Sequence, residues 1–449
     1  MTDLLDIFKR EGAELWTRFT SVWLPEIIHW PGWESLDDAF ARFMFYYPLF
    51  MAYVWMIGAV LYYLRHERKA EGQHPELMTY PKVSILIPCH NEADNIRETL
   101  HFCLNQDYPN FDIIAINDGS RDNTLEILEE LAQRHPELRV INLATNQGKA
   151  VGLRTAALLT PSEFLVCIDG DALLSPDATR WIVRHFIENP DVGAVTGNPR
   201  IRNRSTLLGK VQVGEFSAIV GMIKRAQRLY GRIFTVSGVI AGFRKSALSQ
   251  VGYWSPDMVT EDIDISWKLQ LSGWQIRFEP NALCWVLMPE TLSGLWKQRS
   301  RWAQGGVEVL IRYFGRIFSW RSRGMWPLYL ESVISISWSF LIMGTLMILP
   351  MELFHESRRE QLADLSPSWT SMLLSVTCLV QFAVSLYIDS RYERRVGNTA
   401  RHYYWMIWYP IVYWMINVAT TVNGFFAAVR KKRGQRAIWV TTDRGLRQE

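Results

Sequence analysis

The sequence predicts an α/β domain inserted between transmembrane helices, and three observations support that prediction. Long runs without a charged residue lie towards both ends of the chain, strand-like and helix-like patterns alternate between them, and acidic residues follow several of the predicted strands. The 449 residues are 49% hydrophobic and 21% charged, which excludes a disordered chain, a collagen-like repeat and a small disulfide scaffold. The net charge of +3 is too balanced to indicate binding to nucleic acid.

Four uncharged runs are long enough to cross a bilayer, which takes about 20 apolar residues. They lie at 43–64, 332–351, 365–388 and 403–429. Buried helices of soluble domains usually keep a polar stripe, so we interpret the four runs as membrane spans. The first run is too long and too far inward for a cleaved signal, so we expect a retained anchor. The Trp-rich segment before it is broken by Arg18 and Glu26, which favours an interfacial position.

Charged residues beside these runs predict their orientation. Basic residues directly follow the first run, so residues 65–327 are expected in the cytoplasm. The connection 352–364 is mainly acidic and is expected outside, whereas 389–402 carries four arginines and is expected inside. The basic C-terminal tail also favours the cytoplasm, which conflicts with three crossings after the central domain. Pro410 and Asn417 leave open a last segment that is re-entrant or interfacial.

The central part of the chain alternates between strand and helix patterns. Strands are expected at 82–88, 112–117, 138–143 and 164–168, and helices at 92–104, 122–134 and 148–159. Apolar strands joined through helices predict a parallel sheet that is covered on both faces. In such a sheet the ligand site lies at the carboxyl ends of the strands. The polar residues at those ends are 89–92, 117–120 and 169–171.

Several chemistries lose their main support because their motifs are missing. The sequence has no GxxxxGKS/T phosphate loop, no GxGxxG dinucleotide loop, no HExxH zinc motif and no GxSxG nucleophile elbow. The five cysteines show no paired spacing typical of zinc sites or disulfide frameworks. Carboxylates are therefore the main candidates for chemistry.

Three polar clusters could carry that chemistry. Asp169 and Asp171 flank a glycine after the fourth strand, where two carboxylates can bind Mg²⁺ or Mn²⁺ that bridges a diphosphate; a solvated turn is the alternative. Glu261 and Asp262 precede a helical pattern, and Asp262 is placed to act as a base; a helix N-cap is the alternative. The run 298–302 (QRSRW) combines an amide, a guanidinium and an indole, which suits a sugar diphosphate; its alternative is an amphipathic helix at a membrane surface.

Taken in order, these motifs resemble the processive, membrane-integrated glycosyltransferases of family 2. The matching residues are Asp118 in NDGS, Asp169 and Asp171 in DGD, Asp262 in TED, and Gln298, Arg301 and Trp302 in QxxRW. Longer stretches such as NQGKAVGL and VTEDIDISWKLQL are similar as well, from about residue 40 onward. Residues 1–39 lack the further hydrophobic helix that such synthases often carry. The resemblance implies a GT-A domain, which is the Rossmann-like fold of nucleotide-diphospho-sugar transferases.

The resemblance also implies a role for each candidate residue. Asp262, with Glu261 beside it, would take the proton from the acceptor hydroxyl. The divalent metal, Mg²⁺ or Mn²⁺, would be held by Asp171 and Asp169. The nucleotide and its diphosphate would be bound by Asn91, Glu92, Asp118, Lys149, Asp169, Gln298 and Arg301. The acceptor would contact Ser237, Gly238, Gly242 and Trp302.

The implied reaction is processive, inverting transfer of N-acetylglucosamine from UDP-GlcNAc into a β-1,6-linked exopolysaccharide of the biofilm matrix, with translocation across the bacterial inner membrane. The implied partners are the growing polysaccharide, inner-membrane lipid, and a small membrane subunit through which cyclic di-GMP would act. Alternatives are a synthase of another β-linked polymer (cellulose, chitin or hyaluronan), a nonprocessive lipid-phosphate glycosyltransferase, and a non-catalytic transporter or membrane scaffold.

The expected organisation has six parts. They are an interfacial segment (1–42), a transmembrane helix (43–64), a cytoplasmic GT-A domain (65–290), interfacial helices with QxxRW (291–327), a transmembrane channel region (328–429) and a basic tail (430–449). Within the tail, 438–444 is similar to the gating segments of cellulose and hyaluronan synthases that cover bound UDP-sugar. An ordinary amphipathic tail is the alternative.

Overall fold

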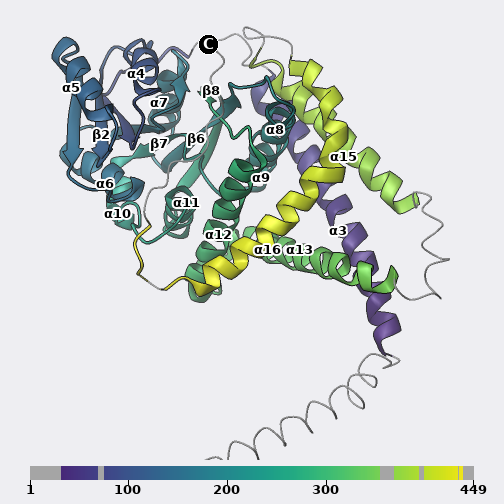
Figure 1. The fold of residues 1–449 in the computed structure, drawn as a ribbon. Coiled ribbons are helices and arrows are strands. Elements are labelled where there is room, and N and C mark those ends of the chain that lie inside the picture. Colours follow the sequence, from purple (N-terminus) through teal and green to yellow (C-terminus); the bar gives the residue numbers. More distant parts are fainter. Residues whose placement is uncertain (1–31, 69–74, 354–368, 394–398, 433, 438–449) are drawn as a thin grey trace, which may run out of the picture. The chain divides into compact units, whose positions relative to one another are not determined.

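The computed structural model describes residues 32–68, 75–353, 369–393, 399–432 and 434–437 (Figure 1). The possible gating segment 438–444 and most of the N-terminal segment 1–42 lie outside the described residues. Two compact units are present, and the described part of the first is the beginning of one helix, up to Phe50. The second unit begins at Met51 and contains an eight-stranded mixed sheet, in the order β3-β2-β1-β4-β7-β6-β8-β5.

The first half of the sheet is parallel, as predicted. Its strands are β1 (Val83–Cys89), β2 (Phe111–Asp118), β3 (Leu138–Leu143) and β4 (Phe164–Ile168), connected through α4 (Ile96–Leu104), α5 (Thr124–Arg134) and α6 (Lys149–Leu159). Both β1 and β4 are buried along their whole length, as expected for apolar strands inside a sheet with two covered faces. The alternation of strands and helices predicted from the sequence is therefore confirmed.

The second half of the sheet is not wholly parallel, so the parallel prediction does not extend to it. Its strands are β5 (Leu173–Leu174), β6 (Val192–Ile201), β7 (Ile240–Arg244) and β8 (Gln275–Val286). β7 runs antiparallel to both β4 and β6, whereas β6 and β8 are parallel. The helices of this half are α7 (Ala178–Glu188), α8 (Leu207–Glu215), α9 (Ile223–Tyr230), α10 (Lys245–Val251) and α11 (Glu261–Leu271), and η3 (Phe216–Met222) joins α8 to α9. Because β7 returns beside β4, the Asp169 N–H donates to the Val239 carbonyl at 3.3 Å.

Three helical segments are long and apolar enough to cross a membrane, and they match three of the four uncharged runs. The segments are Asp38–Glu67, Trp320–Ile348 and Trp369–Asp389. They consist of α3 (Gly32–Tyr62) with η2 (Tyr63–Glu67), of η4 (Trp320–Met325) with α13 (Trp326–Leu353), and of α15 (Trp369–Asp389).

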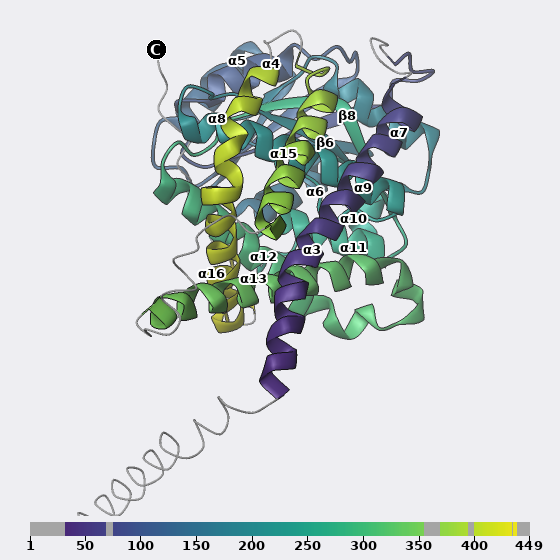
Figure 2. The same cartoon turned by 90° about the vertical axis from the view of Figure 1, so that its right-hand side faces the viewer.

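The fourth uncharged run is not one continuous helix. It is divided into η5 (Thr399–Trp408), η6 (Tyr409–Tyr413) and α16 (Trp414–Arg430), and Pro410 lies at the break. None of these pieces is among the possible membrane spans of the described residues. Instead α16 packs on α12 (Leu292–Ile317), beside which it lies in Figures 1 and 2. A Cβ atom at Gly424 would lie 2.7 Å from the Cβ of Ala303, so only glycine allows this close approach of the helices.

A buried ion network joins the sheet to the ends of two possible membrane spans. Arg225 of α9 donates to Glu67 at 2.7 Å and to one Asp389 oxygen at 2.8 Å. Arg200 of β6 donates to the other Asp389 oxygen and to Glu393, each at 2.5 Å. All five side chains are buried, and buried charges require such partners. The chain segments around Glu67 and Asp389 are therefore anchored on the α/β domain.

The end of the described chain also lies against this domain. After α16, the Lys431 ammonium donates to the Asp257 carbonyl at 2.6 Å and to Glu308 at 2.9 Å. Further on, the Ala437 N–H donates to the Pro256 carbonyl at 2.8 Å. The contacts place the start of the basic tail next to the turn that precedes α11.

Candidate active site

Lys149 connects three motifs that lie far apart in the sequence. Its ammonium donates to Asp169 at 2.6 Å and to the Gly238 carbonyl at 3.0 Å, and it lies 3.1 Å from a Glu261 oxygen. The side chain is largely buried, which by itself lowers the pKa of a lysine. The carboxylates of Asp169 and Glu261 outweigh that effect, so the pKa of Lys149 lies above its ordinary value. Lys149 is thus a fixed positive charge at the carboxyl end of β4.

Asp262 is held beside this charge in a geometry suited to a base. One of its carboxylate oxygens accepts from the Gly238 N–H at 3.1 Å, and the other accepts from the Ile263 N–H at 2.9 Å. Burial, with the neighbouring Glu261 carboxylate, raises the pKa of Asp262 to about 6. The pKa of Glu261 is lowered, because Lys149 overcomes the effect of burial. The pKa values of these two neighbouring acids therefore differ. Asp262 has the higher pKa, so it is the acid that can exchange a proton near neutral pH.

The QxxRW motif reaches this site because α12 packs closely on the start of α11. A Cβ atom at Gly305 would lie 1.8 Å from the Thr260 hydroxyl oxygen, so the contact requires glycine. Arg301 is exposed, and its charge lowers the pKa of Asp262, although less than burial and Glu261 raise it. Gln298 is buried, and its side-chain oxygen has no hydrogen-bond partner among the described residues. An unsatisfied buried acceptor calls for a hydrogen-bond donor.

Trp302 is half-buried next to the same motif. The Arg299 guanidinium stacks over the indole at 4.3 Å, and the Phe216 ring lies 6.4 Å away between centroids. Arg299 is itself fixed by a buried ion pair with Glu215 at 2.6 Å. These contacts hold the ring in one orientation, as a stacking platform requires.

Asp118 positions the loop that precedes Lys149. It is fully buried, and its two carboxylate oxygens accept from the backbone N–H groups of Gln147 at 2.6 Å and Gly148 at 2.8 Å. Gly148 has φ of +90°, a conformation that favours glycine, and α6 starts at the next residue. The direct nucleotide contact expected for Asp118 stays a prediction.

Two predicted contact residues are packed inside the domain. Glu92 is only 1% exposed, and a Cβ atom at Gly170 would lie 2.9 Å from its Cγ, so Glu92 supports the DGD turn from inside the domain. A Cβ atom at Gly242 would lie 2.2 Å from Ile182 of α7, so this glycine serves the packing of β7 on that helix. Direct contact of these two residues with donor and acceptor stays a prediction. Asn91 has φ of +57°, and its side-chain oxygen accepts from the Arg121 N–H at 2.8 Å, which shapes the turn after β1.

The residues at the end of β4 fit a divalent metal that is shared with a diphosphate. Asp169 and Asp171 supply hard carboxylate oxygens, which suit Mg²⁺ and Mn²⁺. Among the described residues there is no group of three or more His, Cys, Asp or Glu side chains that could hold a metal alone. The remaining ligands would therefore come from the substrate, as is usual for Mg²⁺ sites.

Lys224 is a site residue that no motif revealed. It lies on α9, is buried, and donates from its ammonium to the Thr196 hydroxyl at 2.9 Å. The same hydroxyl accepts from the Ser237 N–H at 2.8 Å, next to the glycine that donates to Asp262. Burial lowers the pKa of Lys224 to about 7, against the opposing effect of Asp262. Lys224 stands in the basic run IKRAQR, and no sequence feature distinguishes it there from Arg225 and Arg228.

Replacing Lys224 with methionine is expected to shift the pH profile of turnover. Loss of a nearby positive charge raises the pKa of Asp262, so the acid limb should move to higher pH by roughly half a unit. Thr196→Val is the matched control, because it removes the shared hydroxyl and keeps the charge, and should lower the rate without moving the limb. An acid limb that stays in place in Lys224→Met would contradict the assignment.

The sequence predicts that the acceptor sugar stacks on Trp302. On that prediction, Trp302→Ala should slow elongation about tenfold and change donor affinity less than about twofold, because only the stacking surface is lost. Product length and UDP affinity, both measured in membranes, separate these effects. A Trp that only anchors the helix would instead reduce the yield of folded protein. Normal product length and rate in Trp302→Ala would show that the acceptor is held elsewhere.

Comparison with known proteins gives the class first. Residues 81–305 match the model of the family described as glycosyltransferase like family 2. The chain belongs to glycosyltransferase family 2, and the Asp169, Asp262 and Gln298 motifs lie within the matched residues.

Curated relatives point to a particular enzyme within this family. A poly-β-1,6-N-acetyl-D-glucosamine synthase from Staphylococcus epidermidis is 40% identical over 416 residues, which covers 90% of this chain and 98% of the relative. The synthase of the same name from Staphylococcus aureus strain MSSA476 is 41% identical over 413 residues. A mannosyltransferase from Pyrobaculum calidifontis, solved in complex with GDP-Man and Mn²⁺, has a TM-score of 0.59 at 18% identity and covers 88% of this chain and 99% of its own. This structural likeness supports the GT-A fold.

Proposed function

We propose that the chain polymerises N-acetylglucosamine from UDP-GlcNAc into a β-1,6-linked exopolysaccharide, processively and with inversion at the anomeric carbon. The observation that carries this proposal is the pairing of Asp262 with the Lys149 cluster, in a chain that aligns over 90% of its length with synthases of that polymer. The presence of Asp169, Asp262 and Lys149 together also disfavours a non-catalytic scaffold.

The proposed reaction is a single displacement. The C6 hydroxyl of the acceptor's terminal sugar attacks the anomeric carbon of the donor, Asp262 takes the hydroxyl proton, and the bond from that carbon to the diphosphate oxygen breaks, so that UDP leaves. The attack from the opposite face converts the α-linked donor into a β-linked product. Gln298 and Arg301 would hold the diphosphate while negative charge develops on it.

A divalent cation bound by Asp171 and Asp169 would neutralise part of the charge on the leaving diphosphate. Lys149, already fixed beside Asp169, adds a positive charge that the protein supplies by itself. Trp302 would stack under the terminal sugar of the acceptor, and Ser237 and Gly238 would line the floor below it.

We also propose that the enzyme is a multi-pass protein of the bacterial inner membrane, with the catalytic domain in the cytoplasm. Three possible spans, and the anchoring of Glu67 and Asp389 on the domain, support this arrangement. The pieces after α15 begin and end against the same domain, since Met406 packs on Gly214 and Lys431 contacts Glu308. A cytoplasmic tail is therefore compatible with three crossings in total, of which one precedes the domain and two follow it. The small subunit and cyclic di-GMP stay predictions.

The test is transfer by purified membranes that are supplied separately with UDP-GlcNAc, UDP-glucose and UDP-glucuronate. We expect UDP release and a long polymer with UDP-GlcNAc alone, and complete digestion of the polymer by a β-1,6-specific glucosaminidase. A polymer made from another donor would overturn the proposed sugar. A single-sugar lipid product would overturn processivity.

Asp171→Ala is expected to weaken metal-dependent UDP binding at least about tenfold, because the diphosphate loses the cation that neutralises it. Calorimetry with UDP, in the presence of Mn²⁺ or of a chelator, measures the effect. The matched control is Asp191→Ala, which removes an exposed acid on a loop. Metal-dependent binding of equal strength in both variants would contradict the metal assignment.

A further inference from the structure

A cavity of about 750 Å³ lies between the sheet and η5, and its lining is basic and aromatic. Its basic side chains are Arg202, Arg204, Lys210, Arg401 and His402. The indoles of Trp285 and Trp405 also line it. No acidic side chain lines the cavity within the part of the chain that the structure describes. The basic residues come from three segments: the chain between β6 and α8, α8 itself, and η5.

The positive charge of this cavity is only partly neutralised. Arg202 and Arg204 pair with acids outside the lining, Glu98 and Glu393, each at 2.7 Å. Lys210 instead stacks over the Trp405 indole at 4.8 Å. Among the described residues, neither Lys210 nor the exposed Arg401 has an ion-pair partner.

Two buried nitrogen atoms of lining residues are also unsatisfied. The Nη2 atom of Arg204 and the Nδ1 atom of His402 have no hydrogen-bond partner among the residues that the structure describes. Buried polar atoms in folded proteins are nearly always paired with protein, water or a ligand. Burial, together with Arg204 and Lys210, lowers the pKa of His402 despite the opposing effect of Glu393.

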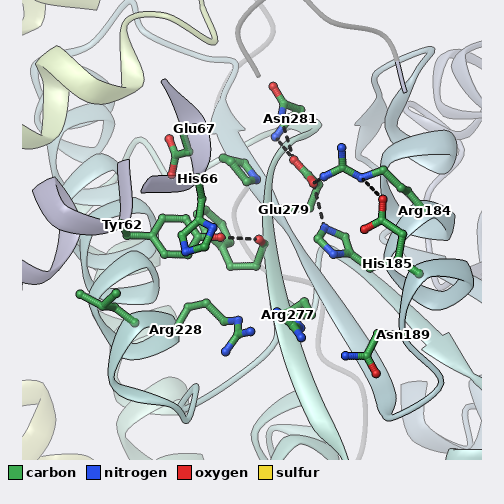
Figure 3. A pocket seen from close by; sticks show the side chains of 14 residues that line it. Tyr62, His66, Glu67, Arg184, His185, Asn189, Arg228, Arg277, Glu279 and Asn281 are labelled. Atoms are coloured by element: carbon green, nitrogen blue, oxygen red, sulfur yellow. Dashed lines mark hydrogen bonds and ion pairs between the residues drawn. The ribbon is translucent and has the colours of Figure 1, made fainter. Parts of the chain in front are cut away.

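Another cavity shows what a balanced lining looks like. The cavity of about 560 Å³ in Figure 3 also contains arginines, but acids face them within the lining. There, Glu279 accepts from His185 at 2.8 Å and lies 3.4 Å from Arg184. Among the described residues, no acid lines the cavity beside η5, so its basic side chains suit an anionic ligand.

The position of η5 favours the membrane as the source of that anion. Next to Arg401 and His402, the side chains of Tyr404, Ile407 and Trp408 are exposed by 77%, 54% and 49%. Exposed aromatic and aliphatic side chains beside basic ones are typical of segments at the headgroup level of a bilayer. The same segment follows closely after α15, a possible membrane span.

We propose that the cavity beside η5 binds the phosphate of an anionic ligand, with Lys210, Arg401 and His402 as its contacts, and that the headgroup of an anionic phospholipid supplies this phosphate. The site is separate from the Asp262 and Lys149 cluster, and the proposal does not depend on which sugar the enzyme transfers. A bound lipid phosphate would tie η5 to the bilayer surface. It would also help to orient α8, against which η5 packs through Met406 and Gly214.

The test uses the full chain, purified in a nonionic detergent, and follows thermal unfolding while lipid is added. We expect phosphatidylglycerol to raise the unfolding temperature and phosphatidylcholine to leave it unchanged, since only a ligand that binds the folded state stabilises it. Inorganic phosphate and glycerol 3-phosphate form a second arm. Stabilisation by the lipid alone supports the headgroup as the source, and equal stabilisation by the soluble anions supports a free phosphate ligand at the same site.

The variants decide whether the effect belongs to this cavity. Arg401→Gln, alone and combined with Lys210→Gln, should require at least tenfold more phosphatidylglycerol for half of the stabilisation. Arg401 is exposed and without an ion-pair partner among the described residues, so the single variant should fold normally. The matched control is Arg323→Gln, which removes an exposed arginine that stacks over Trp320 at 5.3 Å outside the cavity. Equal lipid dependence in the wild type, the Arg401 variants and the control would overturn the proposal.

Discussion

Replacing Asp262 with asparagine is expected to reduce sugar transfer by roughly 1,000-fold, in the range typical for loss of a general base. The asparagine keeps the shape of the side chain and can still accept from the Gly238 N–H, so the fold of the turn should survive. Binding of UDP-GlcNAc and metal should change little, because Asp262 is not among the residues assigned to the diphosphate. The measurements are turnover in membranes and UDP affinity by calorimetry. Wild-type turnover in Asp262→Asn would remove Asp262 from the reaction.

The pH dependence of turnover gives an independent check of the same residue. A base must be deprotonated, so activity should fall as the pH drops through about 6, the pKa to which burial and Glu261 raise Asp262. Glu261→Gln removes the neighbouring negative charge, so the acid limb should move to lower pH. Asp262→Asn should remove the limb from whatever activity remains. A limb that shifts to higher pH in Glu261→Gln would contradict the coupling of the two acids.

Replacing Asp389 with alanine is expected to destabilise the protein by roughly 3–5 kcal/mol, as is typical when one partner of a buried ion pair is removed. Arg200 and Arg225 share this carboxylate, at 2.5 and 2.8 Å, and would face each other across the space that it leaves. The link between α15 and the domain would weaken with it. Unfolding temperature and the yield of folded protein in detergent measure the loss.

The control for Asp389 is an ion pair at the surface. Asp38 pairs with Arg42 at 2.7 Å, but the side chains are 59% and 70% exposed. Such pairs contribute about 0–1 kcal/mol, so Asp38→Ala should leave the unfolding temperature nearly unchanged. If Asp389→Ala were as stable as this control, the network would not hold α15 on the domain.

Local signals were sufficient for much of the architecture. The strands 138–143 and 164–168 agree with β3 and β4 to the residue, because short apolar runs between turns define a buried strand locally. Three of the four uncharged runs are helices that can cross a membrane, since length and composition alone decide that property. The fourth run is divided at Pro410, one of the two residues that had left a re-entrant or interfacial segment open.

The motifs predicted which residues carry chemistry, and Lys149 joins Asp169, Gly238 and Glu261 in space. Their exact roles depended on neighbours that are distant in the sequence. Asp118 holds the loop before Lys149, Glu92 supports the DGD turn, and Gly242 serves the contact with α7. A motif identifies a position, but it does not show which way a side chain points.

By itself, the sequence determined the class of the domain, its parallel half and three possible spans, because each is encoded in consecutive residues. Only the tertiary structure decided the antiparallel return of β7, the contact of Lys224 with Thr196, and the buried network around Asp389. These features join residues far apart in the chain. Their energies come from burial and charge pairing, which exist only once the sheet and helices have packed.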